Sequence, residues 1–110
     1  MKINRIILPV LKDIRNTDIS NENDTLESII PKFKEEVAEF IETIEDNHDI
    51  DHKLEEYFDV VQCMVRYGRV LERMGVNLEG ASIKHYEKLL SRNWNVSDFV
   101  DVFFSVSDDK

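Results

Sequence analysis

Three glutamates lie close together in the segment EEVAE, at Glu35, Glu36 and Glu39. On a helix, residues three apart lie on the same side, so Glu36 and Glu39 would face the same way. Apolar residues recur around them at helical spacing from Phe33 to Ile44, and Glu36 falls at the border of that apolar stripe. Such a run is ordinarily a solvated helix face, but carboxylates gathered beside an apolar stripe can also hold a cation.

A second acidic pair, Glu56 and Asp59, follows Glu39 after sixteen residues and has the same spacing of three. If the two helices pack antiparallel, the pairs face each other across a groove. Four carboxylates there would repel one another strongly unless cations lay between them. Oxygen ligands of this kind suit Mg²⁺, with Mn²⁺ as a possible substitute. The spacing therefore predicts a metal site made by Glu36, Glu39, Glu56 and Asp59.

Charge is distributed unevenly along the chain. Residues 32–59 hold eleven Asp and Glu against three Lys, whereas residues 66–92 hold six Lys and Arg against three Glu. Phosphate chemistry needs both signs, because metal ions and basic side chains share the phosphate oxygens. The pattern therefore predicts a metal-holding half followed by a phosphate-holding half, with chance and solubility as the simpler explanation.

The hydrophobic pattern predicts an all-α helical bundle in which two long antiparallel helices carry the acidic motifs. The first is expected to be capped by Asp24 or Thr25, with Pro31 early in the helix. The second is expected over about residues 51–74, with Gly75 as its C-terminal stop.

Shorter elements are expected on either side of these two helices. An amphipathic helix is predicted over residues 3–15, interrupted or kinked by Pro9. A helix over residues 78–91 would be capped by Asn77. The Phe-rich residues 98–104 read as a last amphipathic turn or two, with a strand as the alternative. We expect these terminal segments to pack onto a single domain that spans residues 1–110.

The second long helix is apolar over more of its circumference than one stripe, from Leu54 to Leu71. A helix of this kind is usually buried on two sides. In a chain of 110 residues, one side can face the core and the other a second subunit. The sequence therefore predicts a homo-oligomer, either a dimer or a tetramer.

Composition narrows the function classes further. The net charge of −9 argues against general nucleic-acid binding, and no apolar run approaches the length of a membrane span. The single cysteine, Cys63, lies in an apolar stretch and is read as a small buried hydrophobe in a reduced, cytoplasmic setting.

The segments SIIPKFKEEVAEFIETIE and LEEYFDVVQCMVRYGRVLERMGV together resemble the MazG-like all-α nucleoside triphosphate pyrophosphohydrolases. The signature of that family is E-E-x-x-E, a spacer, and then E-x-x-D. The later segment IKHYEKLLSRNW resembles the basic segment of the same family. The resemblance covers roughly residues 25–94.

The resemblance implies a Mg²⁺-dependent enzyme that hydrolyses a nucleoside triphosphate to the monophosphate and pyrophosphate, with an active site commonly completed by oligomerisation. It implies metal ligation by the four carboxylates named above. Glu35 would either orient the attacking water or hold a metal-bound water. Lys88 and Arg92 would contact phosphates, and Lys84, one turn earlier, would extend that patch.

Other readings remain open. The same chemistry on dUTP-like or phosphoribosyl-ATP-like substrates is one alternative, and a catalytically idle oligomeric bundle that binds or regulates is another. Trp94 either stacks on a base or covers the end of a helix. His48 and His52 read as exposed residues at a helix junction, while Arg66, Arg69 and Arg73 read as partners of neighbours such as Glu72 or as interface residues.

Overall fold

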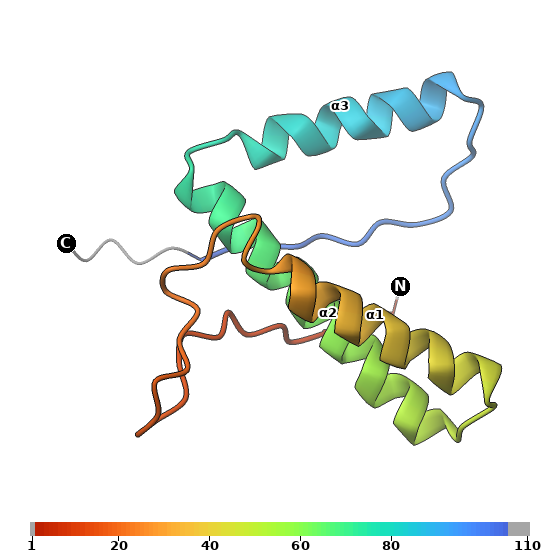
Figure 1. Cartoon of the computed structure of the whole chain (residues 1–110). Helices are drawn as coiled ribbons and strands as arrows, with labels where there is room; N and C mark the ends of the chain where they lie inside the picture. Colours follow the sequence, from red (N-terminus) through yellow and green to blue (C-terminus); the bar gives the residue numbers. More distant parts are fainter. Residues whose placement is uncertain (1, 106–110) are drawn as a thin grey trace. The chain divides into compact units, whose positions relative to one another are not determined.

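The structure is a computed structural model, and it describes residues 2–105. This part of the chain is all-α, with three helices in the order α1 (Ile30–Glu45), α2 (Ile50–Arg73) and α3 (Leu78–Ser91), as Figure 1 shows. No strand occurs among the described residues, where Asp13 and Ser20 form an isolated antiparallel bridge. The all-α prediction is confirmed.

The chain divides into two compact units, Met1–Met74 and Gly75–Lys110, called here the first and the second unit. The first unit contains α1, α2 and the segment that precedes them. The second unit contains α3 and the segment that follows it. The acidic motifs therefore all lie in the first unit, and the predicted phosphate-binding residues all lie in the second.

The start of α1 differs from the prediction. Its N-cap is Ile29, which makes no side-chain capping bond, and Pro31 lies in the first turn as expected. Thr25 and Ser28 instead bond each other's backbone N–H groups through their hydroxyl oxygens, at 2.9 and 3.0 Å. These bonds hold a separate turn before the helix, because short hydroxyl side chains satisfy local backbone donors readily.

The ends of α2 follow from local side-chain chemistry. Asp49 caps the helix by accepting a 2.9 Å hydrogen bond from the backbone N–H of His52. Gly75, just beyond the helix, has a φ of +79°, a conformation that glycine adopts without steric cost. The predicted stop at Gly75 is confirmed, and the bounds of α2 lie within one residue of those expected.

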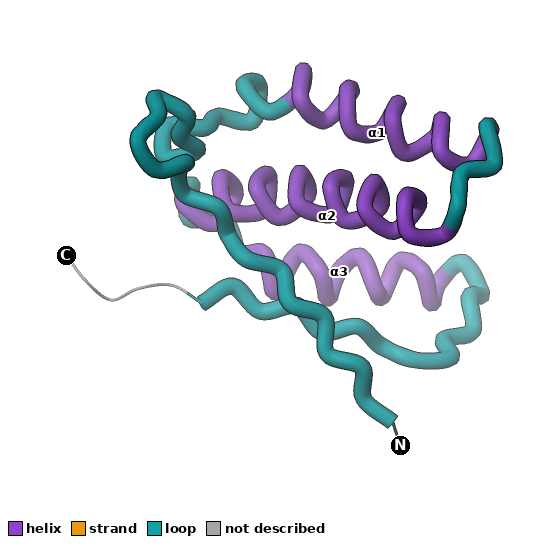
Figure 2. The backbone as a smooth tube through the Cα atoms, turned by 90° about the horizontal axis from the view of Figure 1, so that it is seen from below, coloured by secondary structure: helices purple, strands orange, loops and turns teal. Residues whose placement is uncertain are grey.

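The core of the first unit forms where α1 and α2 lie side by side (Figure 2). Among the described residues, the buried apolar side chains are Ile29, Cys63 and Val70. Thr43 is also buried, and its hydroxyl donates a 2.6 Å hydrogen bond to the Phe40 carbonyl. Cys63 is thus the buried hydrophobe that the sequence predicted.

The helix predicted over residues 3–15 is absent, and residues 2–12 have no regular secondary structure. Most of their apolar side chains are exposed, with Ile3 80% and Ile7 73% accessible to solvent, whereas Leu8 is half-buried. A short amphipathic helix gains most of its stability from burying its apolar face. Without such burial, and with Pro9 lacking a backbone donor, helix formation has little to stabilise it.

In the second unit, α3 has the predicted bounds and is capped by Asn77, which accepts a 2.9 Å bond from the Gly80 N–H. The turn or strand expected over residues 98–104 is absent. Phe99 contacts Tyr86 edge to face, with ring centroids 5.6 Å apart, whereas Phe103 is 87% exposed. In the described part of the Phe-rich segment, the Phe99–Tyr86 contact is therefore found where a periodic apolar face was expected.

The described helices include none with the length and apolar character that crossing a membrane would require.

Candidate metal centre

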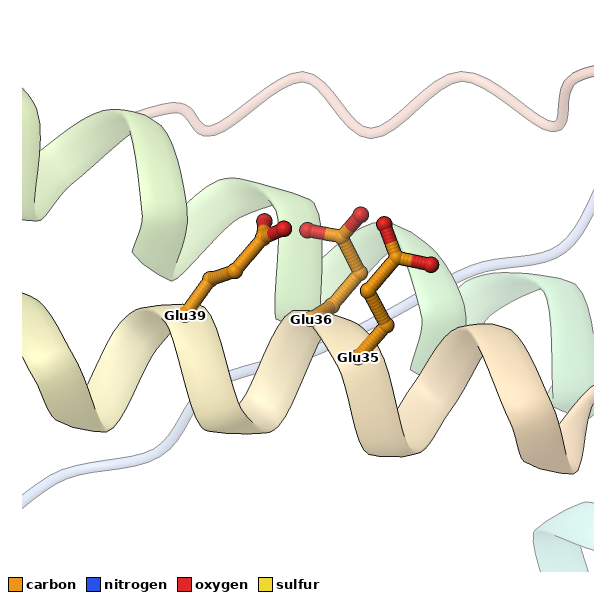
Figure 3. A group of neighbouring side chains, drawn as sticks. All are labelled: Glu35, Glu36 and Glu39. Carbon is orange, nitrogen blue, oxygen red and sulfur yellow. The ribbon is translucent and has the colours of Figure 1, made fainter.

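The carboxylates of Glu35, Glu36 and Glu39 project from one side of α1 (Figure 3). Each offers an oxygen within 4.8 Å of the oxygens offered by the other two. Helical spacing explains this arrangement, because residues three and four apart are neighbours on one helix face. The first half of the predicted site is therefore already assembled by α1 alone.

The second group joins two helices. Glu36 of α1 and Glu56 and Asp59 of α2 also offer oxygens that lie within 4.8 Å of one another. Glu36 belongs to both groups, so the four predicted metal ligands and Glu35 form a continuous set of five carboxylates, called here the carboxylate cluster. Packing α1 beside α2 brings Glu36 together with residues at least twenty positions further along the chain.

Glu36 is the most enclosed member of the carboxylate cluster, with only 6% of its surface exposed. Its Oε2 atom, and the Oε2 atom of Glu56, are buried and have no hydrogen-bond partner among the described residues. Removing a charged oxygen from water without a partner is costly. Two such atoms within one acidic group fit a divalent cation, which would supply the missing contacts.

Lys32 offsets part of the negative charge, and a histidine ring lies close to the cluster. Lys32 Nζ lies 2.9 Å from Glu36 Oε1, and His52 Nε2 lies 3.7 Å from Glu56 Oε1. Both are i, i+4 pairs on a single helix, a spacing at which ion pairs form readily. Each contact involves an Oε1 atom, so the two orphaned Oε2 atoms stay unpaired.

Crowding of negative charge changes the acidity of two members. Desolvation raises the pKa of Asp59 above its ordinary value, and the charges of Glu36 and Glu56 raise this pKa further. Desolvation likewise raises the pKa of Glu39, again with contributions from Glu36 and Glu56. Both shifts have the direction expected for carboxylates that share a site without a cation between them.

A cavity of about 190 Å³ adjoins the carboxylate cluster within the first unit. Glu36, Asp59 and Lys32 line this cavity together with Cys63 and Arg66. Burial raises the pKa of the Cys63 thiol, and the negative charge of Glu36 acts in the same direction. The thiol is therefore held in its neutral form, which agrees with a packing role rather than a nucleophilic one.

Arg66, one of the residues that line the cavity, forms an ion pair that the sequence did not predict. The Arg66 guanidinium donates two hydrogen bonds to the Asp24 carboxylate, one from Nε and one of 2.8 Å from Nη2. This bidentate bond raises the pKa of Arg66. It replaces the predicted Arg66 contact with nearby residues, whereas Arg69 does pair with Glu72, at 2.7 Å.

No local signal could have found the Asp24–Arg66 pair, because its members are 42 residues apart. The Lys32–Glu36 pair was also overlooked, although its i, i+4 spacing is visible in the sequence and is typical of helical ion pairs. Lys32 is thus an additional candidate residue of this site, one that the acidic motif does not include.

The predicted phosphate-binding residues lie along the second unit. Lys84 and Lys88 are on α3, Arg92 is its C-terminal cap residue, and Trp94 follows with 64% of its surface exposed. Lys84, Lys88 and Arg92 are spaced four apart, so they follow one face of the helix. Their roles in substrate binding stay predictions.

The histidines of the helix junction lie close to each other. The rings of His48 and His52 are 4.5 Å apart, edge to face; His52 is exposed as expected, whereas His48 is half-buried and not exposed. The groups of potential metal-binding side chains found in the described part of the chain include neither histidine.

The chain matches no model of a known protein family, no curated protein and no solved structure.

Proposed function

We propose that this protein is a Mg²⁺-dependent nucleoside triphosphate pyrophosphohydrolase that acts as a homo-oligomer in the cytoplasm. The observation that carries the proposal is Glu36, which is 6% exposed, belongs to both carboxylate groups and has a buried oxygen without a partner. The resemblance of the motif spacing to MazG-like enzymes supports the same reading. In the proposed bundle, α1 and α2 would run antiparallel.

Glu36, Glu39, Glu56 and Asp59 would hold the metal, which when bound would activate water and neutralise charge on the phosphates. Their crowding in metal-free protein, reflected in the raised pKa values of Glu39 and Asp59, would be relieved by a divalent cation. Oxygen-only ligands favour Mg²⁺, with Mn²⁺ as a substitute.

Glu35 would either orient the attacking water and accept its proton, or hold a metal-bound water. The attacking oxygen forms a bond to the α-phosphorus as the bond from that phosphorus to the bridging oxygen breaks, and pyrophosphate leaves. Lys84, Lys88 and Arg92 would bind the phosphate oxygens, and Trp94 would stack on the base. The side chains thereby divide the work into metal holding, water positioning and anion binding.

One observation favours a second candidate, a catalytically idle bundle that binds or regulates. The 2.9 Å contact between Lys32 and Glu36 already supplies a positive charge to the most buried carboxylate. In an idle bundle this pair would be permanent, and divalent ions would neither bind nor stabilise the protein.

The decisive experiment is a panel of NTPs and dNTPs, with dUTP and phosphoribosyl-ATP included, assayed with Mg²⁺ for pyrophosphate against phosphate. The wild type should release pyrophosphate, whereas Glu39→Gln and Asp59→Asn should lose at least about 100-fold in rate, because each removes a metal ligand. Glu42→Gln, an exposed carboxylate of α1 outside the carboxylate cluster, is the matched control.

Circular dichroism should show unchanged helicity in all three variants, since none removes a helix cap or a core side chain. Full activity in both Glu39→Gln and Asp59→Asn would contradict the proposal. A wild type that releases no pyrophosphate from any nucleotide and gains no stability from Mg²⁺ or Mn²⁺ would favour the idle bundle.

A further inference from the structure

Lys32 lies one helical turn before Glu36 on α1, and its ammonium group reaches the carboxylate cluster. Nζ is 2.9 Å from Glu36 Oε1 and 3.5 Å from Glu35 Oε1. Lys32 also lines the cavity that Glu36 and Asp59 line. The chain thus carries its own cation at the place where a metal ion would be held.

The two oxygens of Glu36 have different surroundings. Oε1 accepts the contact from Lys32, whereas Oε2 is buried without a partner in the described part of the chain. A divalent ion bound through Glu36 would therefore meet the positive charge of Lys32 on the same carboxylate. Like charges at such short range repel, and the repulsion is screened least where water is excluded.

The pair is unequal in burial. The Lys32 side chain is 50% exposed, whereas the Glu36 side chain is 8% exposed. Lysine has a flexible four-carbon stem and a strongly hydrated head, so Lys32 can move into solvent at little cost. Glu36 has no comparable freedom, and its carboxylate stays in place for whichever cation binds it.

We propose that Lys32 is an internal counter-ion that competes with the divalent metal for Glu36 and thereby sets the metal affinity of the carboxylate cluster. This inference rests on the proposed function only in taking the cluster as a metal site. Without metal, the ammonium neutralises part of the cluster. When metal binds, Lys32 leaves Glu36, and the free energy of the lost contact lowers the net affinity.

The chain offers a matched control two residues away. Lys34 is exposed on the same helix, and no salt bridge of Lys34 occurs among the described residues. Lys32→Met and Lys34→Met change the net charge equally and preserve a helix-forming side chain. Any difference between them therefore reports the contact with Glu36 and not the overall charge.

The experiment is isothermal titration of Mn²⁺ and Mg²⁺ into the full chain at pH 7.5, with paramagnetic resonance of Mn²⁺ as an independent readout of binding. Lys32→Met should bind metal about tenfold more tightly than wild type, because a competing charge and hydrogen bond have been removed. Lys34→Met should stay within about twofold of wild type.

Thermal unfolding in chelator gives a second readout. Lys32→Met should unfold at a lower temperature than Lys34→Met, because the carboxylates have lost their nearest cation. Saturating Mn²⁺ should remove this difference, since a ligand that binds the folded state stabilises it.

Equal metal affinities for Lys32→Met and Lys34→Met, or weaker binding by Lys32→Met, would overturn the inference. Absence of metal binding in every variant would overturn it as well. Tighter binding by Lys32→Met in a protein that hydrolyses no nucleotide would support the role of Lys32 while removing the proposed activity. The two proposals therefore fail by different measurements.

Discussion

The two units of the chain hold the charged residues of the proposed site in different ways, with the carboxylate cluster in the first unit and the predicted phosphate-binding residues in the second. In the first unit, Glu36 is buried between two helices and meets Glu56 and Asp59 there. In the second unit, α3 has no buried residue, and Lys84 and Lys88 are exposed along its surface. The acidic side chains of the first unit are crowded together and partly buried, whereas these basic side chains of the second unit are exposed to solvent.

This difference follows from how many elements contribute to each group. The carboxylates come from α1 and α2, so helix packing forces them together against their mutual repulsion. The basic residues follow one helix at a spacing of four, which local geometry alone provides. Crowded, partly buried carboxylates have shifted pKa values and unpaired oxygen atoms. Such groups mark functional sites more often than exposed charged side chains do.

The largest expected effect concerns the ion pair between Asp24 and Arg66, beside the cavity that adjoins the carboxylate cluster. Asp24→Ala should destabilise the protein by about 1–3 kcal/mol, because it leaves the guanidinium of Arg66 partly buried without its bidentate partner. Urea unfolding followed by circular dichroism measures this change. Asp18→Ala, at an exposed position of the same segment, is the control and should change stability by less than about 0.5 kcal/mol.

A smaller effect is expected from the exposed basic side chains of the second unit. Lys88→Met should raise the KM for a nucleoside triphosphate about tenfold, because one charge-assisted contact to phosphate is lost. Lys53→Met, which removes a lysine near the start of α2, should leave the KM within about twofold of wild type. Similar KM values for both variants would show that α3 has no part in substrate binding, and the contrast between the units would lose its functional meaning.

The smallest effect is a pH dependence in metal-free protein. The pKa of Asp59 is raised by desolvation and by Glu36 and Glu56, so the folded state binds its proton more tightly than the unfolded state does. Stability from this group is therefore present at low pH and is lost as the pH rises from the ordinary value, about 4, through the raised pKa.

Asp59→Asn lacks this titration and should be more stable than wild type in chelator at pH 7. Because Asp59 is exposed and solvent screens its charge, the gain should be below about 1 kcal/mol. Unfolding midpoints at several pH values measure it, with Glu42→Gln as the control. A wild type that becomes more stable than Asp59→Asn as the pH rises would reverse the sign and show that the cluster is not strained.

Local chemistry allowed much of the fold to be predicted. Asn77 and Gly75 acted as sequence signals for a cap and a stop, and both are present. The apolar period of α1 predicted the helix correctly, but the buried residues of this helix are Glu36 and Thr43, whereas Ile41 and Ile44 are exposed. The helix expected over residues 3–15 is absent, and side chains of its apolar period such as Ile3 and Ile7 are exposed, so little burial would stabilise a helix there. Periodicity describes what a segment could bury, not whether a partner is there.

Some features of the candidate site were likewise predictable from the sequence, and others were not. The grouping of Glu35, Glu36 and Glu39 was predictable from helical spacing, and so was the exposure of Lys84 and Lys88. The burial of Glu36, its orphaned oxygen and the distances to α2 were not, since they depend on where the second helix lies.

Sequence signals alone placed α2 and α3 to within one residue and located most of α1, although α1 begins at Ile30 and not after the predicted cap. The tertiary structure alone decided that Glu36 would be shared between two carboxylate groups and that Arg66 would reach back 42 residues to Asp24. Helical periodicity and capping depend on residues three or four positions apart, so they can be recognised in the sequence. Burial of a carboxylate and its closeness to other carboxylates arise only when distant segments pack together and exclude water.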